Sequence, residues 1–436
     1  MNQQMIYGIN DRPQFIKALP LALQHMLVAF TGTLSGSLLL ASGAKMSLED
    51  TTLVIQCGMF IACIASLIQS FGLGKTGIGP KLPIITSGSY TLVAPMVAMA
   101  LDPNIGIAVA FGAALVGSIV LFVLAPLAVK YLNKYFTPVV TGSTVLSVGL
   151  CLLISGYGYC VDYNPGAENV AIIFGIAMFT FLLAFILDSF TKGMVQMLSV
   201  LISILAGYIL CVALNMVDFS SVTEAGLISL PKPVQFGMKF QIGPILTICF
   251  IHIATLMENI GDATNIVSCA ENRLPTNEEL LGTVRGNGLG SIIAALFNGL
   301  PVISGSENGG VIAMSRVASR YVTGLGAILL GILSFFPKFS AILALVPGPV
   351  LGGVMLLTLG SVAANGIRVI GMAELTRRNV TILTISLAIG IGGYYADMVG
   401  YLPFLSTSIK TIFTGISGTA LSALLLNILL PKEKEA

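Results

Sequence analysis

The stretch at residues 300–316, LPVISGSENGGVIAMSR, places ionisable and amide side chains inside a very apolar chain. It holds a carboxylate at Glu307, an amide at Asn308 and a guanidinium at Arg316, together with three glycines. A carboxylate accepts hydrogen bonds, and an amide both donates and accepts them. The glycines make the segment easy to break, so the stretch predicts a place where polar groups meet a solute.

A second polar group lies at residues 256–262, LMENIGD, within another apolar run. Glu258 and Asp262 are four residues apart and therefore share one face of a helix. Carboxylates in a membrane are costly unless they face a cavity, a partner or a proton path, and burial disfavours their charged form. The pair predicts substrate binding or proton exchange; the alternative is an acid that a neighbouring hydroxyl satisfies and that serves the fold.

The chain has only two histidines, His25 and His252. A lone membrane histidine is either a hydrogen-bonded structural residue or a proton carrier, and both interpretations stay open. Neither lies in a metal-binding pattern such as His-Glu-x-x-His. The seven cysteines are scattered without a Cys-x-x-Cys pair, so we expect no metal site, no cofactor and no disulfide framework.

Membrane helices must position these side chains. Of the 436 residues, 56% are hydrophobic and 9% are charged, whereas about 25% are charged in an average soluble domain. The apolar residues form long blocks, and a helix of about 20 such residues crosses a bilayer. The sequence predicts an all-α polytopic membrane protein with about fourteen spans and no large soluble domain. The expected spans are residues 17–41, 51–72, 83–100, 105–129, 137–158, 169–190, 194–216, 243–268, 282–299, 301–316, 321–337, 340–365, 379–395 and 409–430.

The basic residues predict the orientation, since Lys and Arg are retained on the cytoplasmic side. With both termini inside, 16 of the 21 Lys and Arg residues fall at cytoplasmic ends and the other five fall outside. An odd number of spans would scramble this division. The polar N-terminus lacks the order of a cleaved signal peptide. We therefore expect a multi-pass protein of the cytoplasmic (inner) membrane with both termini cytoplasmic.

Two sequence echoes indicate an internal repeat. Residues 82–89, LPIITSGS, resemble residues 300–306, LPVISGS. Residues 137–142, TPVVTG, resemble residues 348–353, GPVLGG. The offsets of 218 and 211 residues are similar, which predicts that the chain consists of two related halves.

The predicted halves are residues 10–216 and 243–430. Each holds seven expected spans, and this odd number makes the second half enter the membrane from the opposite side. Proline and β-branched residues in spans 3 and 10 favour extended backbone, which a membrane tolerates only inside protein or beside a cavity. We expect two short paired β-strands, each leading into a half-helix, at 93–100 and 311–318, with both N-termini facing one cavity. The alternative is a pair of Gly and Pro kinks between packed helices.

At these residues the chain resembles the nucleobase-ascorbate transporter family of bacterial purine and uracil permeases. The run Ser306–Arg316 is similar to the family signature, and the Glu-x-x-Gly-Asp core recurs at Glu258–Asp262. The similarity extends to the Gln24-His25 pair, to Pro138–Gly142 and to Pro347–Gly353, and so covers nearly the whole chain.

This resemblance implies fourteen spans in two inverted repeats of seven. A core domain would take spans 1–4 and 8–11, and a gate domain spans 5–7 and 12–14. Members are usually homodimers and are transporters rather than enzymes, and bacterial members are typically proton symporters. In transport by alternating access, the core would slide against the gate. We expect the glycines of Gly348–Gly353, and the similar sequence at residues 137–142, to give the gate smooth surfaces for this sliding.

The resemblance also implies roles for individual residues. Glu258 aligns with the family's main substrate-binding acid, and Glu307 aligns with a second binding position. Asn308 aligns with the structural residue next to that second position. Tyr90 aligns with an aromatic residue beside the base. His25 and Asp262 align with positions that affect coupling. The expected substrate-binding set is Glu258, Glu307, Tyr90, Ser89, Gly305, Ser306 and Asn308, and the expected proton-coupling set is His25, Asp262 and Glu258.

A nucleobase suits such a site. Its flat edge presents ring N–H donors, which a carboxylate accepts, and carbonyl oxygens, which backbone N–H groups can satisfy. Asp262 and the run Arg316–Val322 look like purine members, whereas Glu307 and Asn287 match uracil members. We expect proton-coupled uptake of a purine such as xanthine or urate, with a uracil symporter as the alternative.

Two other classes fit less well. An anion exchanger or channel on a related fold would need a neutral or cationic binding site, whereas this chain has the two acids Glu258 and Glu307. A membrane-embedded hydrolase would need a nucleophile with a base, and neither histidine lies in a recognisable motif. The partners that the sequence predicts are therefore a small nucleobase, a proton and the lipid bilayer, and not nucleic acid.

Overall fold

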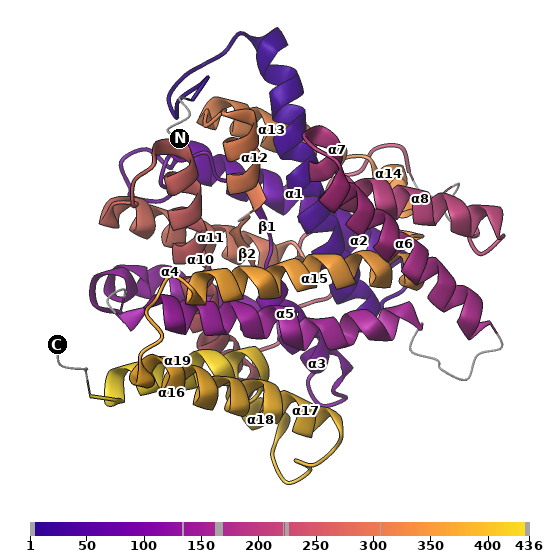
Figure 1. Cartoon of the computed structure of the whole chain (residues 1–436). Coiled ribbons are helices and arrows are strands. Elements are labelled where there is room, and N and C mark those ends of the chain that lie inside the picture. Colours follow the sequence, from indigo (N-terminus) through magenta and orange to yellow (C-terminus); the bar gives the residue numbers. More distant parts are fainter. Residues whose placement is uncertain are drawn as a thin grey trace.

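The computed structural model describes residues 5–132, 135–161, 169–220, 222, 226–305 and 307–431. Within these residues the chain folds almost entirely into helices, which surround a short two-stranded sheet (Figure 1). In chain order the elements are α1 (Phe15–Gly43), α2 (Leu48–Phe71), β1 (Thr86–Gly88), α3 (Tyr90–Leu101), α4 (Ile107–Leu127), η1 (Ala128–Leu132), α5 (Pro138–Cys160), α6 (Val170–Phe190), α7 (Met194–Met197), α8 (Ser199–Ala213), α10 (Ile242–Glu271), α11 (Asn277–Leu296), β2 (Val302–Ser304), α12 (Glu307–Ser315), α13 (Arg320–Leu333), α14 (Pro337–Ala344), α15 (Gly348–Ile370), α16 (Arg377–Leu387), η3 (Ala388–Gly392), α17 (Gly393–Met398), α18 (Thr407–Phe413) and α19 (Gly415–Leu429).

Eight helices among the described residues are long and apolar enough to cross a membrane. They are α1, α2, α4 with its continuation to Tyr131, α5, α6, α10, α15, and the run from α16 to α17. The pair α13 and α14 passes the same test together but is bent by 85°, and α3, α8 and α19 are shorter apolar helices. The predicted multi-pass, mostly helical membrane fold is therefore confirmed, while the number fourteen and the inverted repeat stay predictions.

The two expected strands are present and pair with each other. β1 and β2 run antiparallel, with Thr86 opposite Ser304 and Gly88 opposite Val302. Backbone hydrogen bonds extend the ladder at both ends, from Ser89 N to Pro301 O at 2.8 Å and from Gly305 N to Ile85 O at 2.7 Å. The two sequence echoes at 82–89 and 300–306 thus lie side by side, and α3 and α12 begin directly after the paired strands.

Several boundaries differ from the expected ones. The second half-helix begins at Glu307 rather than 311 and ends at Ser315, because Arg316 takes a left-handed backbone conformation with φ of 56°. The expected span at 340–365 begins only at Gly348, after the bend between α13 and α14. The expected span at 409–430 is divided at Gly415, where φ is 61°.

Glycines lie at an extensive helix contact between α5 and α15, which run side by side (Figure 1). A methyl group at Gly352 would lie 2.6 Å from the backbone nitrogen of Cys160, and one at Gly142 would lie 2.8 Å from that of Ile370. Both glycines therefore lie at the contact between these two helices. The prediction that these glycines supply smooth sliding surfaces stays a prediction, since close packing shows only that small residues are needed there.

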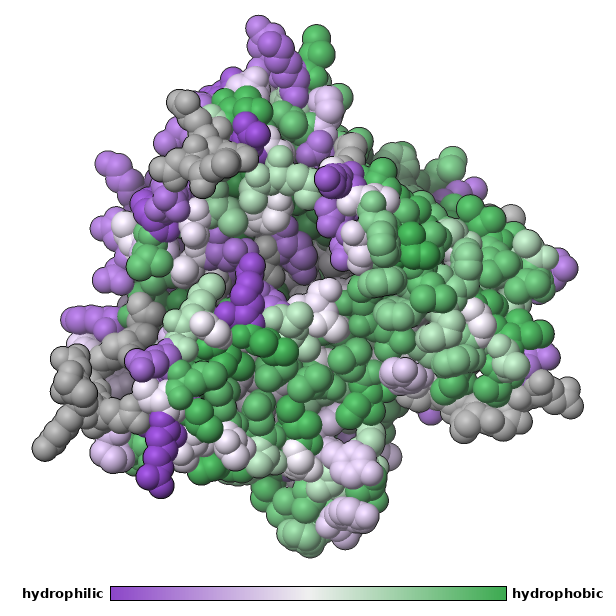
Figure 2. Space-filling model, in the orientation of Figure 1, coloured by the Kyte–Doolittle hydropathy of each residue, from purple (hydrophilic) through white to green (hydrophobic). Residues whose placement is uncertain are grey.

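Hydrophobic side chains cover a broad area of the surface over α5, α6 and α15 (Figure 2). On α6 the exposed apolar residues include Phe174, Phe179, Leu182, Phe185 and Ile186. A surface patch of this size on a polytopic chain is suited to contact lipid. Between this area and the lobe that contains α12 and α13, Figure 2 shows a hollow along which hydrophilic side chains gather.

Candidate functional site

The strand pair brings the starts of two short helices together beside α10. Tyr90 is the first residue of α3, and Glu307 is the first residue of α12. α10 packs against both helices and carries Glu258 at its middle. The segments that the sequence analysis singled out therefore meet, although they are far apart along the chain.

Glu258 is buried, and its two carboxylate oxygens differ in their surroundings. Thr91 Oγ1, on the first turn of α3, donates a hydrogen bond of 2.5 Å to Glu258 Oε1. Glu258 Oε2 is also buried but has no hydrogen-bond partner among the described residues. Because a buried polar atom without a partner among the described residues is costly, this oxygen is a natural acceptor for a bound N–H group.

Asn308 connects three segments of the site. Its Nδ2 donates to Pro83 O, just before β1, at 2.5 Å. Its Oδ1 lies 2.6 Å from Nδ1 of His25 on α1. Since the amide oxygen can only accept, we assign the proton of the buried imidazole to Nδ1. These contacts bring His25 beside Asn308, while the structural role of Asn308 and the coupling role of His25 stay predictions.

A chain of buried amides lies behind β2. Asn287 Nδ2, on α11, donates to Asn259 Oδ1 at 2.5 Å and to Ser304 Oγ at 2.9 Å. Asn287 Oδ1 accepts from Gln69 Nε2, on α2, at 2.6 Å. Asn259 also lies 3.4 Å from the backbone nitrogen of Ser304. The network thus connects α2, α10, α11 and β2 beside Glu258.

The remaining predicted residues lie around these groups. Ser89 is buried, and its Oγ has no hydrogen-bond partner in the described part of the chain. Tyr90 is buried and its hydroxyl lies 3.4 Å from Gly32 O on α1. Asp262 is half-buried on α10, one turn after Glu258, and Gly305 is buried at the end of β2. Ser306 lies outside the described residues.

One face of α12 is exposed in the structure. Glu307 and Gly310 are exposed, and so are Ala313 and Met314 at the end of the same face. On α10, which packs against α12, Gly261 is also exposed. The first residue of α12 therefore presents a carboxylate on an exposed face of the helix.

Sequence reasoning missed the roles of Thr91, Gln69 and Asn259. Each is a polar residue in an apolar run, and such residues in membranes usually face a partner or a cavity. That signal was present, but it did not identify the partner. Among the described residues, no group of three His, Cys, Asp or Glu side chains could hold a metal ion.

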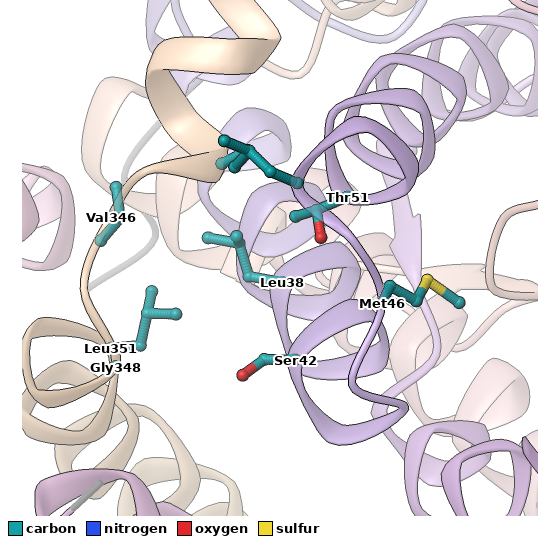
Figure 3. Close-up of a pocket in the computed structure, with 9 residues that line it drawn as sticks. Leu38, Ser42, Met46, Thr51, Val346, Gly348 and Leu351 are labelled. Carbon is teal, nitrogen blue, oxygen red and sulfur yellow. The ribbon is translucent and has the colours of Figure 1, made fainter. Parts of the chain in front are cut away.

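A separate cavity of about 240 Å³ lies between the hairpin of α1 and α2 and the connection from α14 to α15 (Figure 3). The hydroxyls of Ser42 and Thr51 point towards its interior, opposite Val346, Gly348 and Leu351 (Figure 3). Its lining residues are Leu38, Ser42, Met46, Leu48, Thr51, Ala344, Val346, Gly348 and Leu351. None of them is charged, and none belongs to the predicted site.

Comparison with known proteins identifies full-length relatives. The family model Xan_ur_permease, described as a permease family, matches residues 16–399. The xanthine permease XanP of Escherichia coli K12 is 30% identical, over 100% of this chain and 96% of that protein. The uric acid transporter UacT of the same organism is 30% identical, over 94% of this chain and 86% of that protein. A Clostridium perfringens protein with the provisional name of purine permease is 34% identical, over 98% of this chain and 93% of that protein.

Solved structures share the fold at low sequence identity. The transmembrane domain of the cyanobacterial bicarbonate transporter BicA matches with a TM-score of 0.59 at 16% identity, covering 97% of this chain and 100% of that one. SLC26A9 matches with a TM-score of 0.64 at 11% identity, covering 94% of this chain and 66% of that one. At these identities the likeness concerns the fold alone.

Proposed function

We propose that this chain carries a purine nucleobase such as xanthine or urate across the cytoplasmic membrane. It belongs to the permease family of nucleobase-ascorbate transporters. The observation that carries this proposal is the buried Oε2 of Glu258, which no described residue contacts by a hydrogen bond, beside the starts of two half-helices. The named relatives are permeases for xanthine, uric acid and purines. A permease moves its solute and is not an enzyme.

In the proposed binding mode, Glu258 Oε2 accepts a hydrogen bond from a ring N–H of the base. Thr91 holds the other oxygen and so fixes the plane of the carboxylate. Backbone N–H groups at the starts of α3 and α12 meet the base carbonyls, since helix N-termini attract partial negative charge. Tyr90 covers the ring face, and Glu307 contributes a second acceptor. Two carboxylates disfavour an inorganic anion, so likeness in fold to a bicarbonate transporter does not extend to this site.

The proposed architecture comprises fourteen spans in two inverted halves, residues 10–216 and 243–430, with both termini cytoplasmic. The core would consist of spans 1–4 and 8–11 and the gate of spans 5–7 and 12–14, in a homodimer. Glu258 and the strand pair then lie in the core, and the α5 and α15 pair lies in the gate. The exposed face of α12 ends near Arg316, on the proposed cytoplasmic side, which fits a site open to the cytoplasm.

The proposed driving force is the proton gradient. Glu258, Asp262 and Glu307 are acids in or beside the site, and His25 contacts Asn308. Uptake should fall when a protonophore collapses the gradient and should survive replacement of sodium by choline. Uptake that requires sodium and ignores the protonophore would overturn this part of the proposal.

The substrate is tested by uptake in cells that lack their own nucleobase carriers. We expect labelled xanthine or urate to accumulate, and excess unlabelled purine to compete. Labelled guanine, hypoxanthine, uracil and bicarbonate complete the panel. Accumulation of uracil alone would replace purine by pyrimidine, and accumulation of bicarbonate without any base would reject nucleobase transport.

A further inference from the structure

The N-terminal segment before α1 pairs with the chain that follows α12. We call residues 5–11 the N-terminal strap. Tyr7 forms a parallel bridge with Val317, and Figure 1 shows the indigo N-terminal segment beside α12 and α13. The backbone hydrogen bonds run from Ile6 N to Arg316 O at 2.8 Å, from Ala318 N to Tyr7 O at 2.8 Å and from Arg320 N to Ile9 O at 3.1 Å.

The far end of the strap is tied to the start of α13. Ser319 is fully buried, and its Oγ donates to Asp11 O at 2.6 Å. The same hydroxyl oxygen accepts from Val322 N at 3.4 Å and so caps α13. The strap therefore follows the whole connection from the last residue of α12 to the first turn of α13.

The side chain of Ile9 reaches from the strap into the core. It is 9% exposed and belongs to a buried cluster that includes Leu82 and Ile84 before β1, Ile266 and Val267 on α10, and Ile312 on α12. These three segments carry the site, since β1 leads into α3, α10 holds Glu258 and α12 begins with Glu307. Ile9 thus covers the point at which all three meet.

α12 needs such support because it is short. It has nine residues, and isolated helices below about 12–15 residues are marginal in water. Its start is held by the Gly305 bond to Ile85 and by the Asn308 contacts. Its end stops at Arg316 in the left-handed conformation, where the strap makes the next hydrogen bonds.

We propose that the N-terminal strap is a positioning element for α12. By holding Arg316–Ala318 and covering the cluster around Ile312, it fixes the depth and tilt of α12, and hence the placement of Glu307 and Asn308 for the substrate. Ile9 is the residue through which it acts on the packing. The link to substrate rests on the proposed function, whereas the link to α12 does not.

Hydrogen exchange of the purified protein tests the link to α12 without any substrate. Ile9→Ala removes buried contacts, so amides of 307–320 should exchange about tenfold faster or more. Ile6→Ala, at an isoleucine of the same strap that is 62% exposed, is the matched control and should exchange like the wild type. Ile9→Val should restore most of the protection. Equal exchange of 307–320 in the two alanine variants would overturn the proposal.

Transport kinetics then separate positioning from a general effect on folding. With uptake normalised to the amount of protein at the membrane, Ile9→Ala should raise KM several-fold, roughly three- to tenfold, and Ile9→Val should bring KM back towards the wild type. A lower maximal rate with unchanged KM would mean that the strap serves folding only. If the wild type takes up no base at all, the proposed function fails, while the exchange experiment still decides the role of the strap.

Discussion

At the scale of single residues, the proposed chemistry depends most on Glu258. Thr91 already donates to Oε1, so a glutamine there would keep its oxygen towards Thr91 and turn its NH₂ group towards the ligand. That group donates where the base also donates. Glu258→Gln should therefore reduce uptake by about 100-fold or more, in line with the loss of a charged hydrogen bond and its replacement by two opposed donors. The measurement is uptake of the labelled base, with immunodetection of the variant in the membrane to normalise for its amount. Near-normal uptake would show that Glu258 does not bind the substrate.

The hydroxyl of Thr91 provides a second residue-scale prediction. Thr91→Val keeps the shape of the side chain but deletes a hydrogen bond to a carboxylate, worth about 1.5–3 kcal/mol. KM for the base should rise roughly tenfold or more, since each 1.4 kcal/mol corresponds to about a factor of ten. Thr358→Val is the control, because the hydroxyl of Thr358 donates to Val354 O in its own helix. Similar KM values for both variants would show that Thr91 does not orient Glu258.

The sequence was sufficient to select the candidate residues but not their partners. Glu258, Glu307, Asn308 and His25 stand out because polar groups are costly in apolar runs. Their contacts depend on how distant segments pack: Thr91 is 167 residues from Glu258, and His25 is 283 residues from Asn308. No local spacing encodes such pairs, so the hydrogen bonds could only come from the structure.

At the scale of elements, the buried amides hold α2, α10 and α11 around β2, and Asn287 is their centre. Asn287→Ala would remove the hydrogen bonds to Gln69 Nε2, Asn259 Oδ1 and Ser304 Oγ, each of which contributes about 0.5–1.5 kcal/mol. The purified variant should melt several degrees lower than the wild type. Asn365→Ala, which removes a contact to an exposed Arg368 Nη2, is the control and should melt within about a degree.

Asn287→Asp should be milder than Asn287→Ala. Gln69 can still donate to one aspartate oxygen, and Ser304 can turn its hydroxyl to donate to the other. Asn259 Nδ2 has no hydrogen-bond partner within the described ranges, so a flip of that amide would supply another donor. A melting temperature for the aspartate variant that is as low as that of the alanine variant would contradict this flexible network.

Element types were more predictable than element ends. Proline and β-branched residues after Leu82 and Leu300 indicated the two strands, and the structure pairs them as expected. The end of α12 at Ser315 was not predictable, because Arg316 leaves the helix in order to pair with the N-terminal strap. The 85° bend between α13 and α14 likewise depends on tertiary packing rather than on apolar length alone.

At the scale of the whole molecule, the proposed gate is built on the close contact of α5 and α15, whereas the site groups lie in the proposed core. A loosened gate should therefore affect turnover before it affects binding. The glycines along α15 allow a direct test, because they differ in what surrounds them. A methyl group at Gly352 would meet the backbone nitrogen of Cys160 at 2.6 Å, whereas one at Gly360 would meet nothing within 4 Å.

Gly352→Ala should force α5 and α15 apart, at a cost of about 1–3 kcal/mol for overpacking. Gly360→Ala, in the same helix, should be neutral or stabilising by up to about 1 kcal/mol, because alanine loses less backbone freedom than glycine. We expect the purified Gly352 variant to melt several degrees lower, to keep its Kd for the base within about threefold and to transport at least fivefold more slowly. Thermal unfolding, equilibrium binding and uptake of the same two variants measure all three quantities. Parallel loss of binding and transport would show that the contact holds the entire fold, and equal behaviour of the two variants would show that the contact is not tight.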